Sequence, residues 1–173
     1  MDYKLKLLAF NSTDKYKREV EFLKMLMPGC TTIWFNILDY GAGLCKTAFD
    51  CCAEAFDINN YKTHDVIAYH LNELPDKSFQ YIYFMHSLAH IPNTVEVLKD
   101  LKQRYNATIT VITPNASWLK IVGDTKSDPT VIKHYTQSEL KELFVSCGYE
   151  VTLQGQFGEE KNGVNERIFL QAK

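Results

Sequence analysis

The sequence predicts an α/β fold in which a doubly wound, mostly parallel sheet is covered by helices on both faces. Short apolar runs alternate with stretches of helical periodicity along most of the chain, which is typical of repeated strand–helix–strand units. The runs are almost continuously apolar, as in parallel strands buried on both faces. Two further apolar runs, separated by a polar, glycine-rich segment, predict a terminal antiparallel hairpin.

The predicted strands are short segments rich in aromatic and β-branched residues, and they end at glycine, proline or polar turns. They cover residues 32–40, 54–58, 66–70, 79–85, 108–113, 149–157 and 167–172. We therefore expect a sheet of seven strands.

The predicted helices carry apolar residues at a spacing of three or four. They cover residues 13–27, 46–52 and 92–104, and a further helix begins at Thr136. That helix is the best marked, because Thr136 and Glu139 match a capping box and Gly148 supplies a stop. Residues 46–52 allow only about two turns, which is short for a helix that joins parallel strands.

Length and charge restrict the classes of protein that fit. A chain of 173 residues suits one domain with a sizeable core. Its 19 basic and 21 acidic residues give a formal net charge of -2, so we expect no nucleic-acid partner. No apolar run approaches the roughly 18 residues of a membrane span, and the first residues do not match a signal peptide. We expect a cytoplasmic protein with no membrane partner; the sequence is silent on oligomeric state.

Metal-binding patterns are also missing from the sequence. The five cysteines contain no Cys-x-x-Cys pair, which fits neither a disulfide framework nor a zinc ribbon. His86 and His90 form a His-x-x-x-His pattern, but Ser87 stands where zinc peptidases need a glutamate. We expect no metal site.

A Gly-x-Gly turn follows the strand predicted at residues 32–40. Gly41 and Gly43 would let a ligand approach the backbone, the helix start after them offers N–H groups, and Asp57 offers a carboxylate for a ribose diol. A purely structural turn between a strand and a helix remains the alternative. A nicotinamide dehydrogenase is disfavoured, because Lys46 occupies the position of the third glycine in its fingerprint.

Residues 37–45, ILDYGAGLC, resemble the first motif of the class I S-adenosylmethionine-dependent methyltransferases, apolar-apolar-Asp-x-Gly-x-Gly-x-Gly, with Cys45 in place of the last glycine. Asp57 falls where that family keeps its ribose-binding acid. Three later segments also resemble family segments, in family order: residues 74–82 (LPDKSFQYI), 86–92 (HSLAHIP) and 128–149. The resemblance spans residues 37 to about 150.

The resemblance implies a Rossmann-like sheet of seven strands in the order 3-2-1-4-5-7-6, with strand seven antiparallel. This agrees with the strands predicted from composition. We expect one methyltransferase-like domain over residues 1–173. Within it, residues 1–30 would form a helical cover, residues 31–114 the cofactor-binding half and residues 115–173 the acceptor-side half.

The resemblance also implies S-adenosylmethionine as the cofactor and methyl transfer to a small-molecule acceptor, such as a hydroxyl of a sugar or another metabolite. Asp39 would support the loop and the methionine end of the cofactor, Asp57 would accept both ribose hydroxyls, and Ile58 would pack on the adenine. The full set of expected cofactor-binding residues is Asp39, Gly41, Ala42, Gly43, Asp57, Ile58, Asn72, Leu74 and His86.

The acceptor side is expected to use histidines, because an imidazole is the natural base near neutral pH. His86 opens the loop after the strand at residues 79–85 and His134 precedes the capped helix, and we expect both to be catalytic. His90 reads as a structural residue at a helix start. Trp118 and Lys120 either line the acceptor site or belong to a lid helix.

Several positions depart from the family pattern. The family often has an acidic residue that binds the adenine amino group where this chain has His70. Lys46 either meets the cofactor carboxylate or points to solvent. Together with the short helix at residues 46–52, these departures leave an alternative open: a catalytically silent module that binds the cofactor or a partner.

Overall fold

A computed structural model gives the structure of residues 13–27, 37–42, 51, 53–57, 66–68, 74, 79–124 and 128–173, with the backbone alone for residues 66–68. The chain divides into two compact units, Met1–Tyr83 and Phe84–Lys173. The boundary falls inside a strand. The single domain expected from the sequence, with divisions after residues 30 and 114, stays a prediction.

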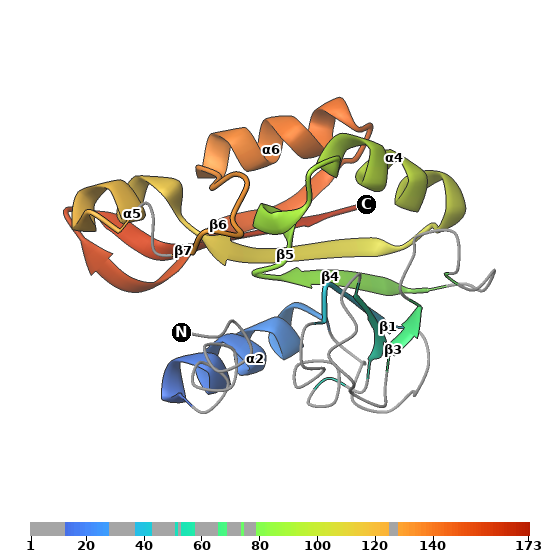
Figure 1. Cartoon of the computed structure of the whole chain (residues 1–173), viewed down its shortest axis with the longest axis horizontal. Coiled ribbons are helices and arrows are strands. Elements are labelled where there is room, and N and C mark those ends of the chain that lie inside the picture. Colours follow the sequence, from blue (N-terminus) through green and yellow to red (C-terminus); the bar gives the residue numbers. More distant parts are fainter. Residues whose placement is uncertain are drawn as a thin grey trace. The chain divides into compact units, whose positions relative to one another are not determined.

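The structure is a mixed α/β fold, as predicted (Figure 1). Its strands follow the order β3-β2-β1-β4-β5-β7-β6, the order that the family resemblance implies. β1 pairs in parallel with β2 and β4, and β2 pairs in parallel with β3. β7 pairs antiparallel with β5 and β6. The strands are β1 (Ile37–Tyr40), β2 (Glu54–Phe56), β3 (Val66–Ala68), β4 (Tyr81–Met85), β5 (Thr108–Pro114), β6 (Val151–Lys161) and β7 (Val164–Ala172).

Among the described residues of the first unit, helix α2 (Asp14–Leu26) comes first in the chain, and it confirms the helix predicted at residues 13–27. The Thr13 side chain caps it by accepting a hydrogen bond from the Tyr16 amide at 3.1 Å. The apolar positions of the predicted stripe, at a spacing of three or four, are all buried: Tyr16, Val20, Leu23 and Met27. Burial of this stripe stabilises the helix more than local propensity does.

Two predictions in the first unit lie partly outside the described residues. The strand predicted at residues 32–40 is described only from Ile37 onward, and all four residues of β1 are buried. The helix predicted at residues 46–52 lies outside the described residues except for Cys51, a turn residue.

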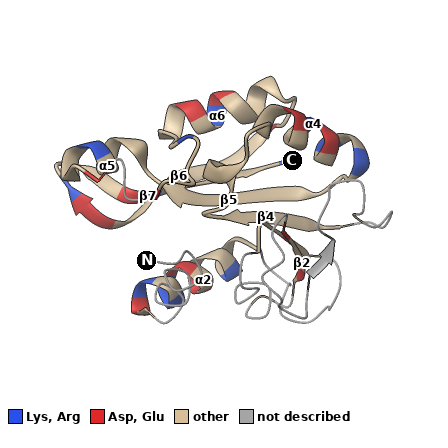
Figure 2. Ribbon diagram, viewed as in Figure 1, with Lys and Arg blue, Asp and Glu red and all other residues tan. Residues whose placement is uncertain are grey.

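The second unit carries a one-turn 3₁₀ helix, η2 (Leu88–His90), and helices α4 (Thr94–Arg104), α5 (Ala116–Val122) and α6 (Gln137–Ser146). α6 packs on β6 and β7, and α5 contacts β7. The Tyr149 hydroxyl donates a 2.8 Å hydrogen bond to the Leu98 carbonyl and so ties the end of α6 to α4. β4 and β5 carry no charged residue, whereas both signs of charge lie on the helices (Figure 2).

Helix α5 contains Trp118 and Lys120, for which the sequence left a lid helix open as one of two alternatives. The Asn115 side chain caps its start by accepting from the Ser117 amide at 3.0 Å, and Gly123 ends it with a φ of 76°. A helix this short shows too few apolar positions to reveal a period. The helix predicted from Thr136 is confirmed, with both halves of its capping box formed.

The terminal hairpin is longer than predicted. The segment GEEKNGVNE was expected to join the two strands as a loop, but most of it extends β6 and β7. Only Asn162 and Gly163 form the turn, with φ values of 55° and 75°, as in the two-residue turn favoured by right-handed twist. The outer strand is mostly exposed, so its polar residues are compatible with strand and the loop interpretation was wrong.

Candidate functional site

The glycine turn and the acid predicted to bind ribose lie side by side in the first unit. β1 and β2 are parallel neighbours, with Tyr40 opposite Phe56. Gly41 therefore follows the carboxyl end of β1, and Asp57 follows the carboxyl end of β2. The amides of Gly41 and Ala42 both donate to the Phe56 carbonyl, at 2.7 and 3.0 Å. Gly41 has a φ of 85°, a conformation that favours glycine. The turn is thereby fixed against the residue that precedes Asp57.

Two buried carboxylates belong to this region. Asp39 lies inside β1, with Ala55 and Tyr83 as its partners across the neighbouring strands. It is only 1% exposed, and Asp57 is 6% exposed. Buried carboxylates are uncommon because burial disfavours their charge. One buried carboxylate inside β1 and another directly after the parallel neighbour β2 are typical of a ligand site rather than a plain connection.

Asp39 also interacts with a buried phenol. Burial raises the pKa of Tyr83 well above its ordinary value, and the charge of Asp39 raises this pKa further. Cys51 and Tyr16 act in the same direction. Tyr16 belongs to α2, so this helix contributes to the electrostatic surroundings of Tyr83.

The remaining cofactor-binding predictions divide between described and undescribed residues. Leu74 is buried, at 3% exposed. Gly43, Ile58 and Asn72 lie outside the described residues, as do Cys45, Lys46 and His70. Among the described residues, the structure therefore brings together Asp39, Gly41, Ala42 and Asp57.

His86 follows β4 directly, as predicted. Its amide donates a 2.8 Å hydrogen bond to the Ile112 carbonyl of β5. Its φ is 61°, which is uncommon for a residue other than glycine and is often found at functional sites. The side chain is partly exposed.

His134 lies in a segment that is fastened to η2 and to the start of α5. The amides of Ile132 and Lys133 donate to the Ala89 carbonyl at 2.8 and 3.1 Å, and the Ala116 amide donates to the Tyr135 carbonyl at 2.9 Å. Burial lowers the pKa of His134, and repulsion from His90 lowers it further against the opposing pull of Asp124 and Asp128. The imidazole of His134 is therefore neutral at pH 7.

A third histidine, His90, belongs to a chain of polar contacts that the sequence did not reveal. The Thr130 hydroxyl lies 2.9 Å from Nδ1 of His90 and 2.7 Å from Oδ1 of Asp128. The Thr130 amide donates to the same Oδ1 at 2.9 Å. The Asp-Pro-Thr sequence is the available signal, because an aspartate readily accepts bonds from the amide two residues later. Nothing in the sequence indicates that His90 lies against it.

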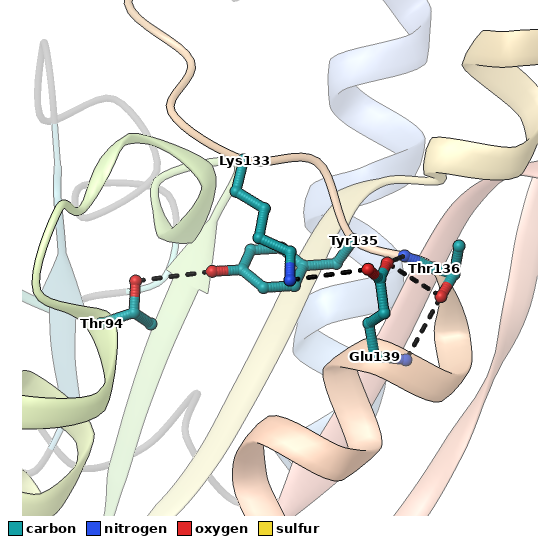
Figure 3. A network of polar contacts seen from close by, with 5 residues as sticks. All are labelled: Thr94, Lys133, Tyr135, Thr136 and Glu139. Atoms are coloured by element: carbon teal, nitrogen blue, oxygen red, sulfur yellow. Dashed lines mark hydrogen bonds and ion pairs between the residues drawn. The ribbon is translucent and has the colours of Figure 1, made fainter.

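An open groove of about 330 Å³ adjoins this segment in the second unit. Its lining includes Tyr135, whose hydroxyl lies 3.4 Å from Oγ1 of Thr94 (Figure 3). Lys133 extends over the Tyr135 ring and pairs with Glu139 at 3.5 Å. The groove is also lined by the polar side chains of Asn93 and Glu96 and by five apolar residues: Ile91, Pro92, Val95, Ile132 and Leu143.

Two further properties concern the described residues alone. Within them, no three His, Cys, Asp or Glu side chains are grouped so that they could hold a metal ion. Over the same part of the chain, no helix has the length and apolar character needed to cross a membrane.

The sequence matches no family model and no curated protein. Solved structures do match. A SAM-dependent methyltransferase from Archaeoglobus fulgidus superposes with a TM-score of 0.73 and 18% identity, over 99% of each chain. An S-adenosylmethionine-dependent methyltransferase from Clostridium acetobutylicum gives a TM-score of 0.71 and 11% identity, over 99% of this chain and 98% of that one. The chain therefore has the fold found in S-adenosylmethionine-dependent methyltransferases.

The comparisons correct one expectation. The small RNA methyltransferase HEN1 matches with a TM-score of 0.70 and 13% identity, and a chain of the Pnkp1/Rnl/Hen1 RNA repair complex with 0.65 and 15%. This chain spans 25% and 42% of their lengths. Proteins named for RNA thus share the fold, and net charge does not exclude a nucleic-acid partner. The expectation was wrong because catalytic folds need not carry the basic excess of a dedicated nucleic-acid-binding domain.

Proposed function

We propose that the protein transfers a methyl group from S-adenosylmethionine to a hydroxyl of a small molecule, such as a sugar or another metabolite. The observation that carries this proposal is the pair of hydrogen bonds from Gly41 and Ala42 to the Phe56 carbonyl. They set the glycine turn beside Asp57 in a fold that solved S-adenosylmethionine-dependent methyltransferases share. The resemblance of residues 128–149 to the branch of the family that acts on metabolites supports the acceptor class.

The residues of the turn fit the cofactor in a specific way. Asp57 offers two acceptor oxygens to two ribose hydroxyls, and Gly41 leaves room for a close approach of the ligand. The Gly41 and Ala42 amides are occupied by the Phe56 carbonyl, so they shape the turn. We assign the anionic end of the cofactor to the amides that follow Gly43 instead.

The other cofactor contacts follow the family resemblance. Asp39 would hold the loop and the methionine end, and Ile58 would pack on the adenine. The proposed cofactor-binding set is Asp39, Gly41, Ala42, Gly43, Asp57, Ile58, Asn72, Leu74 and His86. Bound there, S-adenosylmethionine supplies a methyl group on a positively charged sulfur.

The chain contributes mainly orientation and proton acceptance. Holding the reactants in line can supply about 7 to 11 kcal/mol of a barrier. His86 and His134 are the proposed catalytic residues that contact the acceptor. His134 suits this role because its lowered pKa keeps the ring neutral, and a neutral imidazole can accept a hydrogen bond from a hydroxyl.

Isothermal titration with S-adenosylmethionine and S-adenosylhomocysteine tests the proposal. We expect binding by the unaltered chain and a loss of about tenfold or more in Asp57→Asn, which keeps the volume but removes the charge. Asp14→Asn, on the exposed face of α2, is the matched control and should bind like the unaltered chain. A folded chain that binds neither ligand would overturn the proposal, whereas binding without turnover on any acceptor would favour the silent module.

A further inference from the structure

We propose that Tyr83 is a positioning residue for Asp39: its phenol donates a hydrogen bond to the buried carboxylate and keeps Asp39 charged and oriented next to the glycine turn, where it attracts the methionine end of the cofactor. The cofactor part of this role rests on the proposed function, whereas the pairing of Tyr83 with Asp39 does not. All the residues that take part belong to the first unit, Met1–Tyr83.

Strand pairing sets the two side chains beside each other. Asp39 in β1 is opposite Tyr83 in β4 on one side and opposite Ala55 in β2 on the other. Side chains of residues that are directly opposite leave a sheet on the same face. Ala55 has no polar side chain, so of these two cross-strand neighbours only Tyr83 offers the carboxylate a proton.

Both groups are shielded from water. Asp39 is 1% exposed and Tyr83 is 0% exposed, and a buried hydroxyl needs a hydrogen-bond partner. Among the described residues, no acceptor other than Asp39 meets the Tyr83 hydroxyl, and the contact with Asp39 is longer or less well aligned than an ideal hydrogen bond. Such contacts often tighten when a ligand binds. The Asp39 carboxylate is therefore the acceptor for the Tyr83 phenol.

The electrostatic effects of the pair point the same way. Burial raises the pKa of Tyr83 well above its ordinary value, and the charge of Asp39 and the hydrogen bond to it raise this pKa further. Tyr83 therefore stays protonated and remains a donor. A hydrogen bond donated to the charged form of a carboxylate favours that form, whereas burial favours the neutral form. The phenol thus offsets the effect of burial on Asp39.

Other titratable groups of the first unit lie in the same surroundings. Cys51 and Tyr16 also raise the pKa of the phenol. Glu19 on α2 and Asp57 after β2 are the other buried acids among the described residues of this unit. Because these two acids also bind protons as the pH falls, a test of the pair must follow the titration of Asp39 itself.

The position of Asp39 gives its charge a function. Asp39 lies two residues before Gly41, whose amide donates to the Phe56 carbonyl at 2.7 Å. The carboxyl ends of such parallel strands are where ligands bind in open α/β sheets. The methionine end of S-adenosylmethionine carries an ammonium group and a positively charged sulfur. A charged Asp39 attracts that end of the cofactor, and a protonated Asp39 does not.

Carbon-13 NMR of the side-chain carboxyl groups, on the full chain without cofactor, tests the pairing directly. Asp39→Asn identifies the Asp39 signal by its loss. We expect Asp39 to titrate about one pH unit or more higher in Tyr83→Phe than in the unaltered chain, because the carboxylate stays buried and loses its donor. Tyr149→Phe removes another buried phenol, which bonds to the Leu98 carbonyl in the second unit, and should leave the Asp39 midpoint unchanged. An unchanged midpoint in Tyr83→Phe would overturn the role of Tyr83.

A double-mutant cycle tests the pair even where Tyr83→Phe folds poorly. Loss of the donor alone leaves a buried charge without it, whereas loss of both partners does not. Tyr83→Phe should therefore lower the urea midpoint of unfolding less in an Asp39→Asn background than in the unaltered chain, and the double variant should fold where the single variant fails. Tyr149→Phe should have the same effect in both backgrounds. An equal effect of Tyr83→Phe in both would overturn the coupling.

Titration with S-adenosylhomocysteine at decreasing pH separates this role from the proposed function. No binding by the folded, unaltered chain would overturn the proposed function and the cofactor part of the role, while the NMR result for the pair would stand. Where the unaltered chain binds, Tyr83→Phe should lose affinity at a higher pH as the solution is acidified, with a loss of about tenfold where Asp39 is protonated in the variant alone. The same pH dependence in both proteins would overturn a role of Tyr83 in cofactor binding.

Discussion

The amide of Gly41 donates a 2.7 Å hydrogen bond to the carbonyl of Phe56. This bond joins the residue after β1 to the last residue of β2, and it sets the turn that follows β1 beside Asp57. Gly41 and Phe56, which are 15 positions apart in the sequence, thus become neighbours at the carboxyl ends of two parallel strands, where ligands bind in open α/β sheets.

Replacing Gly41 by alanine should weaken both folding and cofactor binding. The φ of 85° is unfavourable for a residue with a Cβ, so we expect a loss of about 1 to 2 kcal/mol in the free energy of unfolding. Distortion of the turn should also weaken S-adenosylhomocysteine binding, as measured by titration calorimetry. Gly163→Ala is the matched control, because Gly163 also has a positive φ, of 75°, with open space around it. Gly163→Ala should lower the free energy of unfolding by a similar amount and leave S-adenosylhomocysteine binding unchanged. If the two variants bind S-adenosylhomocysteine equally well, a role of the Gly41 turn in cofactor binding is contradicted.

Gly155→Ala should destabilise the hairpin through a clash. A Cβ at this position would lie 2.7 Å from Cε1 of the Phe169 ring on β7, so the ring must move. We expect a loss of about 1 to 3 kcal/mol, measured by urea unfolding. The same change in a Phe169→Leu background should cost less, because the ring atoms that clash are gone. An equal cost in both backgrounds would show that backbone propensity, and not the ring, makes Gly155 necessary.

Tyr149 should make the protein less stable in alkaline solution. Burial is the main cause that raises its pKa far above the ordinary value, so the unfolded chain releases this proton at a lower pH than the folded one. The contribution of Tyr149 to the free energy of unfolding is therefore fully present below the pKa of tyrosine in the unfolded chain, about 10, and falls as the pH rises above it. At pH 7, Tyr149→Phe should lower the free energy of unfolding by about 1 kcal/mol, because the hydrogen bond to the Leu98 carbonyl is lost. In thermal melts the stability of Tyr149→Phe should also decline less steeply as the pH passes the ordinary tyrosine pKa of about 10, between about pH 9 and 11. An unchanged decline would contradict the burial of this phenol.

His134 should make the protein less stable in mild acid. Its pKa is lowered in the folded chain, so below a pH of about 6.5 the unfolded chain binds a proton that the folded chain excludes. Stability from this group is therefore present above that pH and is lost as the pH falls. His134→Gln should flatten the dependence of the unfolding free energy on pH in this range. A histidine NMR titration with an ordinary midpoint for His134 would contradict the prediction.

Thr136→Ala should destabilise α6. The Thr136 side chain accepts from the Glu139 amide at 3.2 Å, and Glu139 accepts from the Thr136 amide at 2.8 Å. Loss of such a cap costs about 0.5 to 2 kcal/mol, which chemical denaturation can measure. Thr136→Ser keeps the hydroxyl and should retain most of the stability; an equal loss in both variants would argue against the cap.

Local signals located most elements of the fold. The helix at residues 13–27 was predicted from its apolar period. The helix that begins at Thr136 was predicted because an apolar period and a capping box agree with each other. The hairpin was predicted too short, because exposed strands can carry the polar residues that were interpreted as a loop. Helix α5 was left open only as a lid helix around Trp118 and Lys120, because seven residues are too few to display a period.

The site was predicted unevenly for a physical reason. Asp39, Gly41 and Asp57 could be predicted because they lie at fixed offsets from a strand–turn motif. Tyr83 was not predicted as a neighbour of Asp39, because it is the pairing of β4 with β1 that places the two residues opposite each other.

The sequence by itself determined the α/β class, the strand order through its resemblance to a known family, and the glycine turn with its aspartate, because local period and motif spacing encode them. Tertiary structure alone decided which groups meet across loops. It brought Thr130 against His90, 40 positions away in the sequence, and buried His134 enough to lower its pKa. Contacts of this kind depend on how segments far apart in the chain pack and exclude water, and no local pattern of residues specifies that.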